Sequence, residues 1–331
     1  MEMLEKIEVD PNADRKLPGL RIALDNAAVR DTLAATCFTN GVRLEKVQSR
    51  VLKYKPGKTC VIAYSCSPDA PEASPIEIIG KMYRKSRGED IARRVERLWR
   101  STLNVNGGPS LQIPEPLGYA AKTGLVFQRR ASGRVLTEFG PEEDVEKAIL
   151  WSARNLAALH LTNVIGLPPK TMRDHIDKLC HPGPQKLCKA APETSPLVRA
   201  ILTALEDERR LANLWLCPVH GDMNLSQIIV QERNVCFIDF DGLCLSHPAL
   251  DVGNFIVTIK VKFPEVGEKL AETFLSAYLE QRNIERVAGL HLYMALAYLR
   301  RAMIQFRSRK STWLKDAVKL LQSGKSCLES V

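Results

Sequence analysis

The segment from Val219 to Gly242, VHGDMNLSQIIVQERNVCFIDFDG, sets several acids and an amide between two apolar runs. Asp222 precedes the amide of Gln227 by five residues, and Asp239 lies at the end of the apolar run that follows. An acid and an amide oxygen are hard ligands that suit Mg²⁺, while a second acid can accept a proton from a nucleophile. A metal held by Gln227 and Asp239 leaves Asp222 free as a base, which is the division of labour that phosphoryl transfer requires.

A β-hairpin is the element that must bring these groups together. Residues 228–230 and 235–240 have the apolar character of short strands, and the polar residues 231–234 between them form the predicted turn. The second strand then returns Asp239 to the end of the hairpin at which Asp222 and Gln227 lie. The three side chains are therefore predicted to surround one small volume.

The rest of the chain predicts an α+β fold with two lobes. Residues 1–131 contain strand-like runs that predict a small antiparallel sheet: VQSRVLKYK, TCVIAYSC, IEIIGKMYR and the hairpin LGYAAKTGLVFQRR. A helix is predicted within this lobe from Glu89 to Leu103. Residues 132–331 have mostly helical apolar spacing, with helices predicted near 145–160, 196–213, 267–281 and 286–305. A hinge near residues 128–133 joins the lobes.

The run HGDMNLSQ followed by IDFDG resembles the aminoglycoside phosphotransferase and choline kinase-like enzymes, which are relatives of protein kinases. Their usual pattern is HGD, four residues, Asn, and then a strand that ends in Ile-Asp. HPALDVGN, at residues 247–254, resembles the segment that follows in the family. The resemblance implies a bilobal protein-kinase-like fold, with ATP or GTP and Mg²⁺ as cofactors and the hydroxyl of a small molecule as acceptor.

The resemblance also implies roles for the residues of the HGD segment. Asp222 takes the role of catalytic base, and Asp239 that of principal Mg²⁺ ligand. Gln227 stands where the family more often has Asn, although maltokinase-like members also carry Gln, and it is expected to be the second metal ligand with altered geometry.

Three further residues are expected to support the loop. His220 is expected to hold it through hydrogen bonds, and Asp251 resembles the family's structural aspartate that buttresses it. Asn254 is expected to assist, with a simple helix cap as the alternative.

The first lobe offers candidates for binding the nucleotide. Lys81 shares a strand face with Ile79 and Tyr83, where a charge needs a partner, and an ATP phosphate is the natural one. The following helix supplies Glu96 as the expected anchoring acid, as in the kinase lysine-glutamate pair, with Glu89 as the second choice.

Two loops of the first lobe complete the expected nucleotide site. Backbone N–H groups of the turn KPGKT, which includes Lys58, could cradle a phosphate, and an ordinary hairpin turn is the equal alternative, since the turn is not a Walker or GxGxxG motif. Gln128, Arg129 and Arg130 resemble the hinge whose backbone meets adenine.

Two alternatives to a kinase remain open at this stage. A nucleotide-binding pseudokinase is favoured by Gln227 and by the glycine-poor turn, whereas the presence of Asp222 and Asp239 argues against it. A haloacid-dehalogenase-type phosphatase would use Asp239 as nucleophile and Asp241 as general acid. That motif normally opens its domain and is followed by α/β units, but here mostly helices follow.

The charge of the chain bears on its partners. The formal net charge is +9, but basic residues are spread through two stretches with helical apolar spacing, KMYRKSRGEDIARRVERLWR and YLRRAMIQFRSRKSTWLKDAVKL, as expected of solvated helix faces. No nucleic-acid-binding signature is present, so no nucleic-acid partner is expected. A basic chain also favours a neutral, singly charged or anionic acceptor, such as a sugar, nucleoside-like compound or macrolide-like antibiotic, over a polycationic aminoglycoside.

The expected location is the cytoplasm, without attachment to a membrane. The first residues, MEMLEKIEVD, carry acids where a secretory signal has positive charge, and no 18-residue apolar stretch is present. Nine scattered cysteines without a CxxC spacing are expected to be reduced core residues. The cluster of His175, Cys180, His181 and Cys188 has the residue types of a zinc site, but flanking prolines favour a loop.

Overall fold

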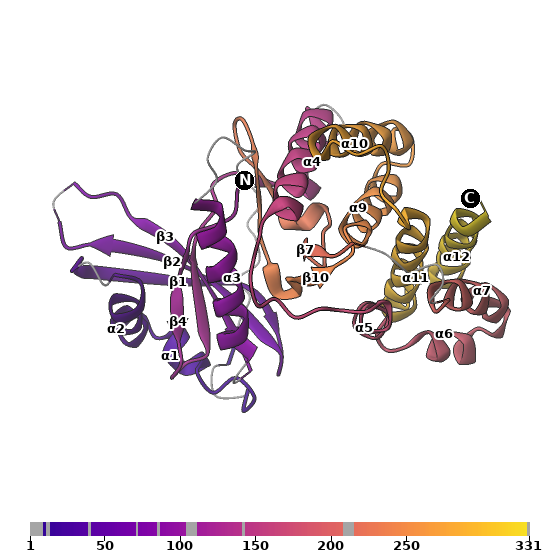
Figure 1. The fold of residues 1–331 in the computed structure, drawn as a ribbon. Coiled ribbons are helices and arrows are strands. Elements are labelled where there is room, and N and C mark those ends of the chain that lie inside the picture. Colours follow the sequence, from indigo (N-terminus) through magenta and orange to yellow (C-terminus); the bar gives the residue numbers. More distant parts are fainter. Residues whose placement is uncertain are drawn as a thin grey trace. The chain divides into compact units, whose positions relative to one another are not determined.

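The computed structural model describes residues 9–10, 14–38, 41–70, 72–84, 87–103, 111–140, 143–207 and 215–329. Contacts divide the chain into two compact units, Met1–Leu103 with Ile113–Ser132 and Asn104–Gln112 with Gly133–Val331. The first carries an antiparallel sheet and the second is mainly helical (Figure 1). Most of the MEMLEKIEVD segment and the end of the helix predicted over 196–213 lie outside the described residues.

The sheet of the first unit has five strands in the order β1-β2-β3-β5-β4, each antiparallel to its neighbours. The strands are β1 (Leu44–Lys55), β2 (Thr59–Pro68), β3 (Ile76–Tyr83), β4 (Pro116–Ala120) and β5 (Leu125–Arg129). Side chains alternate between the two faces, so Ile78 and Met82 of β3 are fully buried while Lys81 between them is half-buried on the other face.

Two short helices that the sequence did not predict, α1 (Leu20–Leu24) and α2 (Asn26–Cys37), cover the apolar face of this sheet. Asp25 begins α2, because its carboxylate accepts hydrogen bonds from the backbone N–H groups of Ala27 and Ala28. Leu20 and Leu33 are fully buried against the strands. The helix predicted from Glu89 is α3 (Arg87–Leu103), which packs along β4 and β5.

Helices dominate the second unit: α4 (Val145–Leu161), α5 (Met172–Leu179), α6 (Pro184–Ala190), α7 (Ser195–Leu205), α9 (Ala249–Lys262), α10 (Gly267–Arg282), α11 (Leu290–Ser308) and α12 (Trp313–Glu329). α9 is central, because it packs against both α10 and α11, and α11 packs in turn against α12 (Figure 1). Eleven consecutive residues of α9, from Ala249 to Ile259, are buried, so this helix lacks the amphipathic spacing by which the other helices were predicted.

Short strands and single helical turns carry the HGD and IDFDG segments. β6 (Arg134–Val135), β8 (Ile228–Val230) and β9 (Val235–Phe237) form one antiparallel sheet, and β7 (Cys217–Val219) pairs with β10 (Cys244–Ser246) in another. The 3₁₀ turns are η1 (Leu136–Glu138), η2 (Pro192–Thr194), η3 (Leu225–Gln227) and η4 (Phe240–Gly242). The predicted hairpin is thus present, but its second strand ends at Phe237 and not at Phe240.

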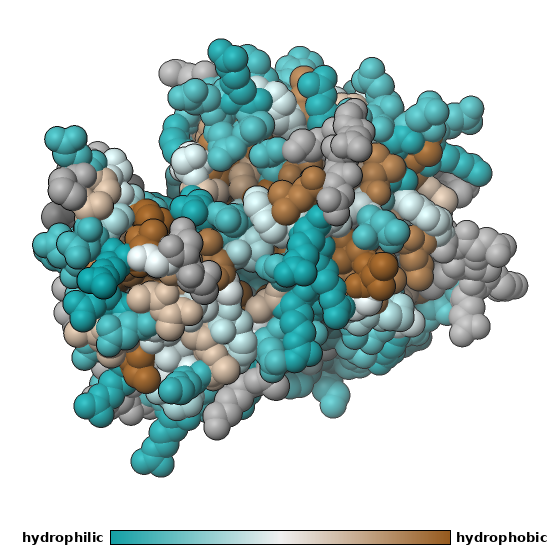
Figure 2. Space-filling view, turned by 60° about the vertical axis from the view of Figure 1, so that its left-hand side comes forward, coloured by the Kyte–Doolittle hydropathy of each residue, from teal (hydrophilic) through white to brown (hydrophobic). Residues whose placement is uncertain are grey.

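The surface is mixed in character. On the face drawn in Figure 2, hydrophilic side chains cover much of the surface and hydrophobic ones gather in separate areas between them. Among the described residues, no helix combines the length and apolar character needed to cross a bilayer.

Candidate active site

The HGD loop follows β7 and is packed backbone to backbone against the segment after β9. Gly221 has φ +73°, and a Cβ there would lie 2.5 Å from the carbonyl oxygen of Gly242. A Cβ on Gly242 would lie 2.6 Å from the carbonyl oxygen of His220. Only glycine fits at both positions, and this close approach fixes the HGD loop against the IDFDG loop.

Asp251, at the start of α9, anchors the same loop. Its carboxylate accepts hydrogen bonds from the backbone N–H of His220 at 2.6 Å and of Gly221 at 2.9 Å, and it is fully buried. The structure therefore places Asp251 where the predicted buttress would act.

A buried histidine and tyrosine extend this anchor. His160 Nε2 lies 3.3 Å from Asp251 Oδ2, and His160 Nδ1 lies 2.7 Å from the hydroxyl of Tyr278. Burial lowers the pKa of His160, so the ring is neutral, with Nε2–H donating to Asp251 and Nδ1 accepting from Tyr278. Burial alone would raise the pKa of Asp251, but the hydrogen bonds from the His160 side chain and the His220 backbone outweigh this and lower it. Sequence reasoning missed His160, which lies at the end of the helix predicted near 145–160 and was given no role.

His220 connects the two loops directly. Its Nε2–H donates to the carbonyl oxygen of Ile238 at 2.9 Å, and its ring packs on Phe240 with centroids 4.7 Å apart. Asn254 donates from its side-chain amide to the carbonyl oxygen of Met223, one residue beyond Asp222. Both predicted supporting residues thus hydrogen-bond the backbone of the segments that carry Asp222 and Asp239.

Asp239 and Gln227 lie at the same end of the hairpin. The backbone N–H of Ile238 donates to the carbonyl oxygen of Gln227 at 3.0 Å, and Asp239 follows immediately. Asp239 adopts a left-handed conformation, φ 66° and ψ 56°, which is uncommon outside glycine and is often associated with functional sites. One carboxylate and one amide oxygen are a donor set that fits Mg²⁺.

Asp222 lies in a pocket with a volume of about 300 Å³ within the second unit. Its walls include Asp222, Asn224, Gln227, Asn254, Arg300 and Arg301. Asp239 is not part of this lining, so the structure brings Gln227, but not Asp239, into the pocket with Asp222. Asn224 donates to the backbone carbonyl oxygen of Asp222 at 2.8 Å and also begins η3, which holds the loop in a tight turn.

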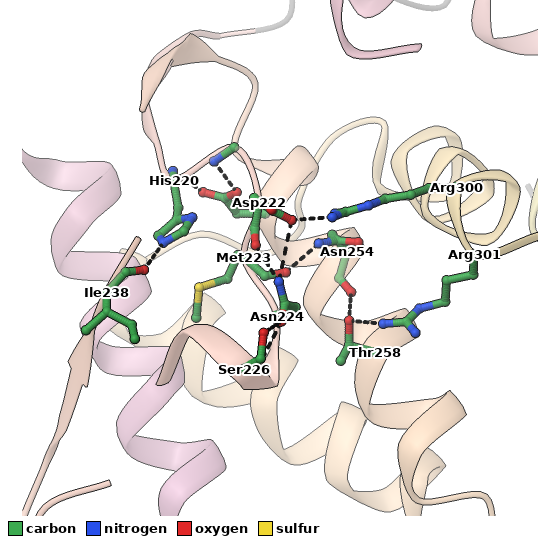
Figure 3. A network of polar contacts seen from close by, with 12 residues as sticks. His220, Asp222, Met223, Asn224, Ser226, Ile238, Asn254, Thr258, Arg300 and Arg301 are labelled. Carbon is green, nitrogen blue, oxygen red and sulfur yellow. Dashed lines mark hydrogen bonds and ion pairs between the residues drawn. The ribbon is translucent and has the colours of Figure 1, made fainter. Parts of the chain in front are cut away.

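Two arginines of α11 extend toward Asp222 of the HGD loop and Thr258 of α9 (Figure 3). Arg300 Nη2 donates to Asp222 Oδ1, and the Arg300 side chain is only 18% exposed. Arg301 Nη2 donates to the hydroxyl of Thr258, whose own O–H donates to the carbonyl oxygen of Asn254 at 2.7 Å. The two side chains therefore contact the HGD loop itself and the α9 residues that support it.

These contacts correct the interpretation of YLRRAMIQFRSRK as a solvated helix face. Arg300 and Arg301 turn inward because α11 packs across α9. A signal was present in the sequence, because two adjacent arginines interrupt a run of apolar residues. Adjacent positions on a helix project in different directions, so two arginines between buried residues are not both expected to point into solvent.

The nucleotide-binding candidates lie in the first unit. Lys81 is on the face of β3 that was predicted, with its Nζ 5.1 Å from the centroid of the Tyr83 ring. Glu96 pairs with Arg100 at 2.8 Å on the same helix, and Glu89 pairs with Arg93. The proposed pairing of Lys81 with Glu96 stays a prediction.

The KPGKT turn is engaged by a carboxylate. Asp14 Oδ2 accepts from the backbone N–H of Gly57 at 2.7 Å and from the hydroxyl of Tyr54 at 2.9 Å. Burial of Asp14 raises its pKa, but these hydrogen bonds outweigh the effect and lower it. A backbone donor that was predicted for a nucleotide phosphate is therefore used by Asp14, while Lys58 is exposed.

The predicted hinge residues end β5. Gln128 pairs with Ile79 of β3, while Arg129 and Arg130 form ion pairs with Glu115 at 2.7 Å and Glu77 at 3.1 Å. Their contact with adenine stays a prediction.

The histidine and cysteine cluster has a packing role. His175 Nε2 lies 2.8 Å from the hydroxyl of Ser246, and Cys180 is fully buried. Within the described parts of the chain, no group of three or more His, Cys, Asp and Glu side chains is placed to hold a metal.

The geometry of two short loops held together behind Asp222 accords with the sequence comparisons. A profile described as the phosphotransferase enzyme family matches residues 79–290. The chain belongs to the phosphotransferase enzyme family. A search among curated protein sequences finds no match.

Solved structures of the family have the same fold at low identity. The choline kinase of Cryptosporidium parvum Iowa II is 12% identical, with a TM-score of 0.61 over 92% of this chain and 95% of that one. A thermostable mutant of aminoglycoside phosphotransferase APH(4)-Ia is 15% identical, with a TM-score of 0.61 over 91% and 100%. Spectinomycin phosphotransferase APH(9)-Ia, solved with ADP and spectinomycin, is 13% identical, with a TM-score of 0.55 over 92% and 98%.

The predicted family, the bilobal kinase-like α+β fold and the enzyme class of small-molecule kinase are thereby confirmed. The Gln variant at position 227 stays a prediction. The phosphatase alternative needs an α/β domain after its motif, whereas β9 belongs to a small antiparallel sheet and helices follow it. The described part of the chain therefore does not have the fold that this phosphatase class requires.

Proposed function

We propose that this phosphotransferase moves the γ-phosphoryl group of ATP, or of GTP, to a hydroxyl of a small molecule, with Asp222 as the base. The observation that carries the proposal is the placement of Asp222 at the wall of a pocket, on a loop that is anchored from behind by Asp251 and Asn254. A fixed carboxylate at the edge of a small cavity is what a base needs in order to meet one hydroxyl repeatedly.

In the proposed reaction the acceptor oxygen forms a bond to the γ-phosphorus, and the bond from that phosphorus to the bridging oxygen of the β-phosphate breaks. The hydroxyl proton goes to Asp222, and the products are the phosphate ester and the nucleoside diphosphate. Asn224 and Asn254 hold the loop, while Arg300 holds the Asp222 carboxylate before the acceptor binds.

Gln227 and Asp239 are the residues that would hold Mg²⁺, since both supply hard oxygen ligands at one end of the hairpin. A bound Mg²⁺ neutralises charge on the nucleotide phosphates. Lys81, with Glu96 as the proposed partner, would bind nucleotide phosphates, and the backbone of residues 128–130 would meet the purine ring of the nucleotide. The proposed location is the cytoplasm, with no nucleic-acid or membrane partner.

A screen of hydroxyl compounds tests the proposal. The purified chain is incubated with ATP or GTP and Mg²⁺, and each compound is examined by mass spectrometry for the mass of one added phosphate. Calorimetry with Mg-ATP on the wild type and Asp239→Ala follows nucleotide binding separately, with Asp177→Ala as an exposed acid control. The proposal expects a phosphorylated product and weaker Mg-ATP binding by Asp239→Ala alone. Nucleotide hydrolysis without any phosphorylated compound, or unchanged Mg-ATP affinity in Asp239→Ala, would contradict it.

A further inference from the structure

The pocket beside Asp222 carries more positive than negative charge. Its charged lining residues are Asp222, Arg300 and Arg301, so two guanidinium groups face a single carboxylate. The other walls named above are amides, which have no net charge. Because Arg300 already pairs with Asp222, the charge of Arg301 is the one left over within the described lining.

Arg301 is also incompletely hydrogen-bonded. Its Nη2 donates to the Thr258 hydroxyl, but its Nε is buried and has no hydrogen-bond partner among the described residues. A guanidinium has five donors and no acceptor, so only a group that supplies oxygen lone pairs can satisfy it. Leaving such a donor unpaired and buried costs stability, and no described side chain supplies the missing acceptor to this arginine, which also lines the pocket.

The neighbours of Arg301 on α11 strengthen this argument. Burial, and then the adjacent charge of Arg300, lowers the pKa of Arg301 to about 10. The same helix carries Arg307, whose pKa is lowered by burial and by Arg300. Arg300 and Arg301 are adjacent, partly buried and both line the pocket, so their like charges repel each other, and an anion bound between them relieves that repulsion.

We propose that the acceptor carries an anionic group, a carboxylate or a phosphate, which binds to Arg301 and Arg300 in this pocket. The inference rests on the kinase function proposed above and adds the chemical class of the acceptor. The planar fork of an arginine matches the paired oxygens of either group and distinguishes them from a neutral hydroxyl or a cation. A volume of about 300 Å³ is at the small end for ligand pockets, which favours an acceptor the size of a monosaccharide or smaller.

The anion also explains how Asp222 becomes available as a base. Arg300 donates to the Asp222 carboxylate. An acceptor anion competes for the same guanidinium and leaves the carboxylate to meet the hydroxyl of the compound that brought the anion. Arg301 is thus a specificity-determining residue. Arg300 links acceptor binding to the release of the Asp222 carboxylate from its ion pair.

Compounds that share a scaffold and differ in charge test the proposal. One set is glucosamine, glucose, glucuronate and glucose 6-phosphate, and a second is 3-aminopropane-1,2-diol, glycerol, glycerate and glycerol 3-phosphate. Transfer from ATP is measured with the wild type, Arg301→Gln, Arg301→Lys and, as a matched control, Arg199→Gln, which removes an exposed positive charge on α7 of the same unit.

The proposal expects an anionic member to have a kcat/KM at least about tenfold above its neutral counterpart. Arg301→Gln should lower that preference about 10- to 100-fold, mainly through KM, since a charge-assisted hydrogen bond is lost. Arg301→Lys should retain part of it, and Arg199→Gln all of it. Phosphorylation that favours neutral or cationic members, in the wild type and Arg301→Gln alike, would overturn the anionic class and leave the kinase function standing.

A binding measurement separates the two proposals if none of these compounds is phosphorylated. Inorganic phosphate is titrated calorimetrically in saturating Mg-ADP, so that nucleotide-binding residues are already engaged. Binding that is lost in Arg301→Gln and kept in Arg199→Gln supports the anion site independently of catalysis. Equal phosphate binding in all three proteins, or none in the wild type, would overturn it.

Discussion

Replacing Asp251 by Asn tests whether one buried carboxylate holds the HGD loop. The carboxylate accepts two backbone N–H groups, from His220 and Gly221, as well as the Nε2–H of His160. Asparagine keeps one oxygen and replaces the other with a donor, so at least one of these hydrogen bonds is lost and a backbone N–H faces an NH₂ group. Hydrogen bonds to charged groups contribute about 1.5–3 kcal/mol each, so we expect a loss of about 2–4 kcal/mol in the free energy of unfolding.

Urea unfolding followed by tryptophan fluorescence measures this loss. Three of the four tryptophans, Trp151, Trp215 and Trp313, belong to the second unit, so their signal reports mainly on the unit that contains Asp251. Asp177→Asn is the control, because Asp177 is exposed on α5 and its ion pair with Arg173 contributes less than about 1 kcal/mol. Far-UV circular dichroism, recorded in parallel, checks that both probes follow one transition.

The reasoning fails if Asp251→Asn unfolds within about 0.5 kcal/mol of Asp177→Asn. That result would mean that losing the hydrogen bonds of Asp251 does not change the free energy of unfolding, and that other contacts hold the HGD loop. A loss of turnover without a loss of stability would place Asp251 in the chemistry and not in the support of the loop.

Three further predictions concern other parts of the chain. Asp14→Asn should lower the free energy of unfolding by about 1–3 kcal/mol at pH 7, because the Gly57 turn loses a charged acceptor. The pKa of Asp14 is lowered in the folded state, so the difference between the two proteins should be full above pH ~4, the unfolded-state pKa, and should shrink as the pH falls through the lower folded-state pKa; a difference independent of pH contradicts this. Gly221→Ala should give a poorly folded or inactive protein, since its Cβ would lie 2.5 Å from the Gly242 carbonyl oxygen. Gly140→Ala, whose Cβ would have Glu143 Oε2 at 3.9 Å as its nearest neighbour among the described residues, should behave like the wild type in circular dichroism and activity; equal behaviour of the two variants refutes the packing argument. His175 is buried with a pKa lowered to about 4, so protons bind the unfolded chain preferentially between pH ~6.5 and 4, and the free energy of unfolding falls as the pH falls through this range. His175→Gln should remove about 2 kcal/mol of the loss that the wild type shows between pH 7.5 and 5.0 in urea unfolding, and parallel pH curves of the two proteins would exclude this role of His175.

Local sequence patterns were sufficient for much of the fold. The alternation along IEIIGKMYR placed Lys81 on the correct face of β3, and the two apolar runs after the HGD motif placed Asp239 beside Gln227. Both inferences depend on residues a few positions apart, where strand geometry dictates the outcome. The helix α9 escaped prediction because it is buried on every side and so has no polar face to give it a period.

Contacts between distant residues were beyond this kind of reasoning. Arg300 is 78 residues from Asp222, His160 is 91 from Asp251, and Gly57 is 43 from Asp14. Each pair meets only because whole helices and strands pack, and no window of sequence contains both partners. The charge of the pocket followed from such packing, which placed two arginines of an apparently solvated helix in the pocket lining, one paired with Asp222 and the other with Thr258.

The central claim is that Asp222 is the base of a phosphotransferase. Its most direct test is the turnover of Asp222→Asn with an acceptor that the screen has shown the wild type to phosphorylate. Glu232→Gln, an exposed acid in the β8–β9 turn, is the matched control. We predict that Asp222→Asn lowers kcat about 100-fold or more, because a positioned base contributes that much, while its Mg-ATP affinity and unfolding curve stay close to those of the control. An Asp222→Asn protein that phosphorylates the acceptor as fast as the Glu232→Gln control would contradict the account.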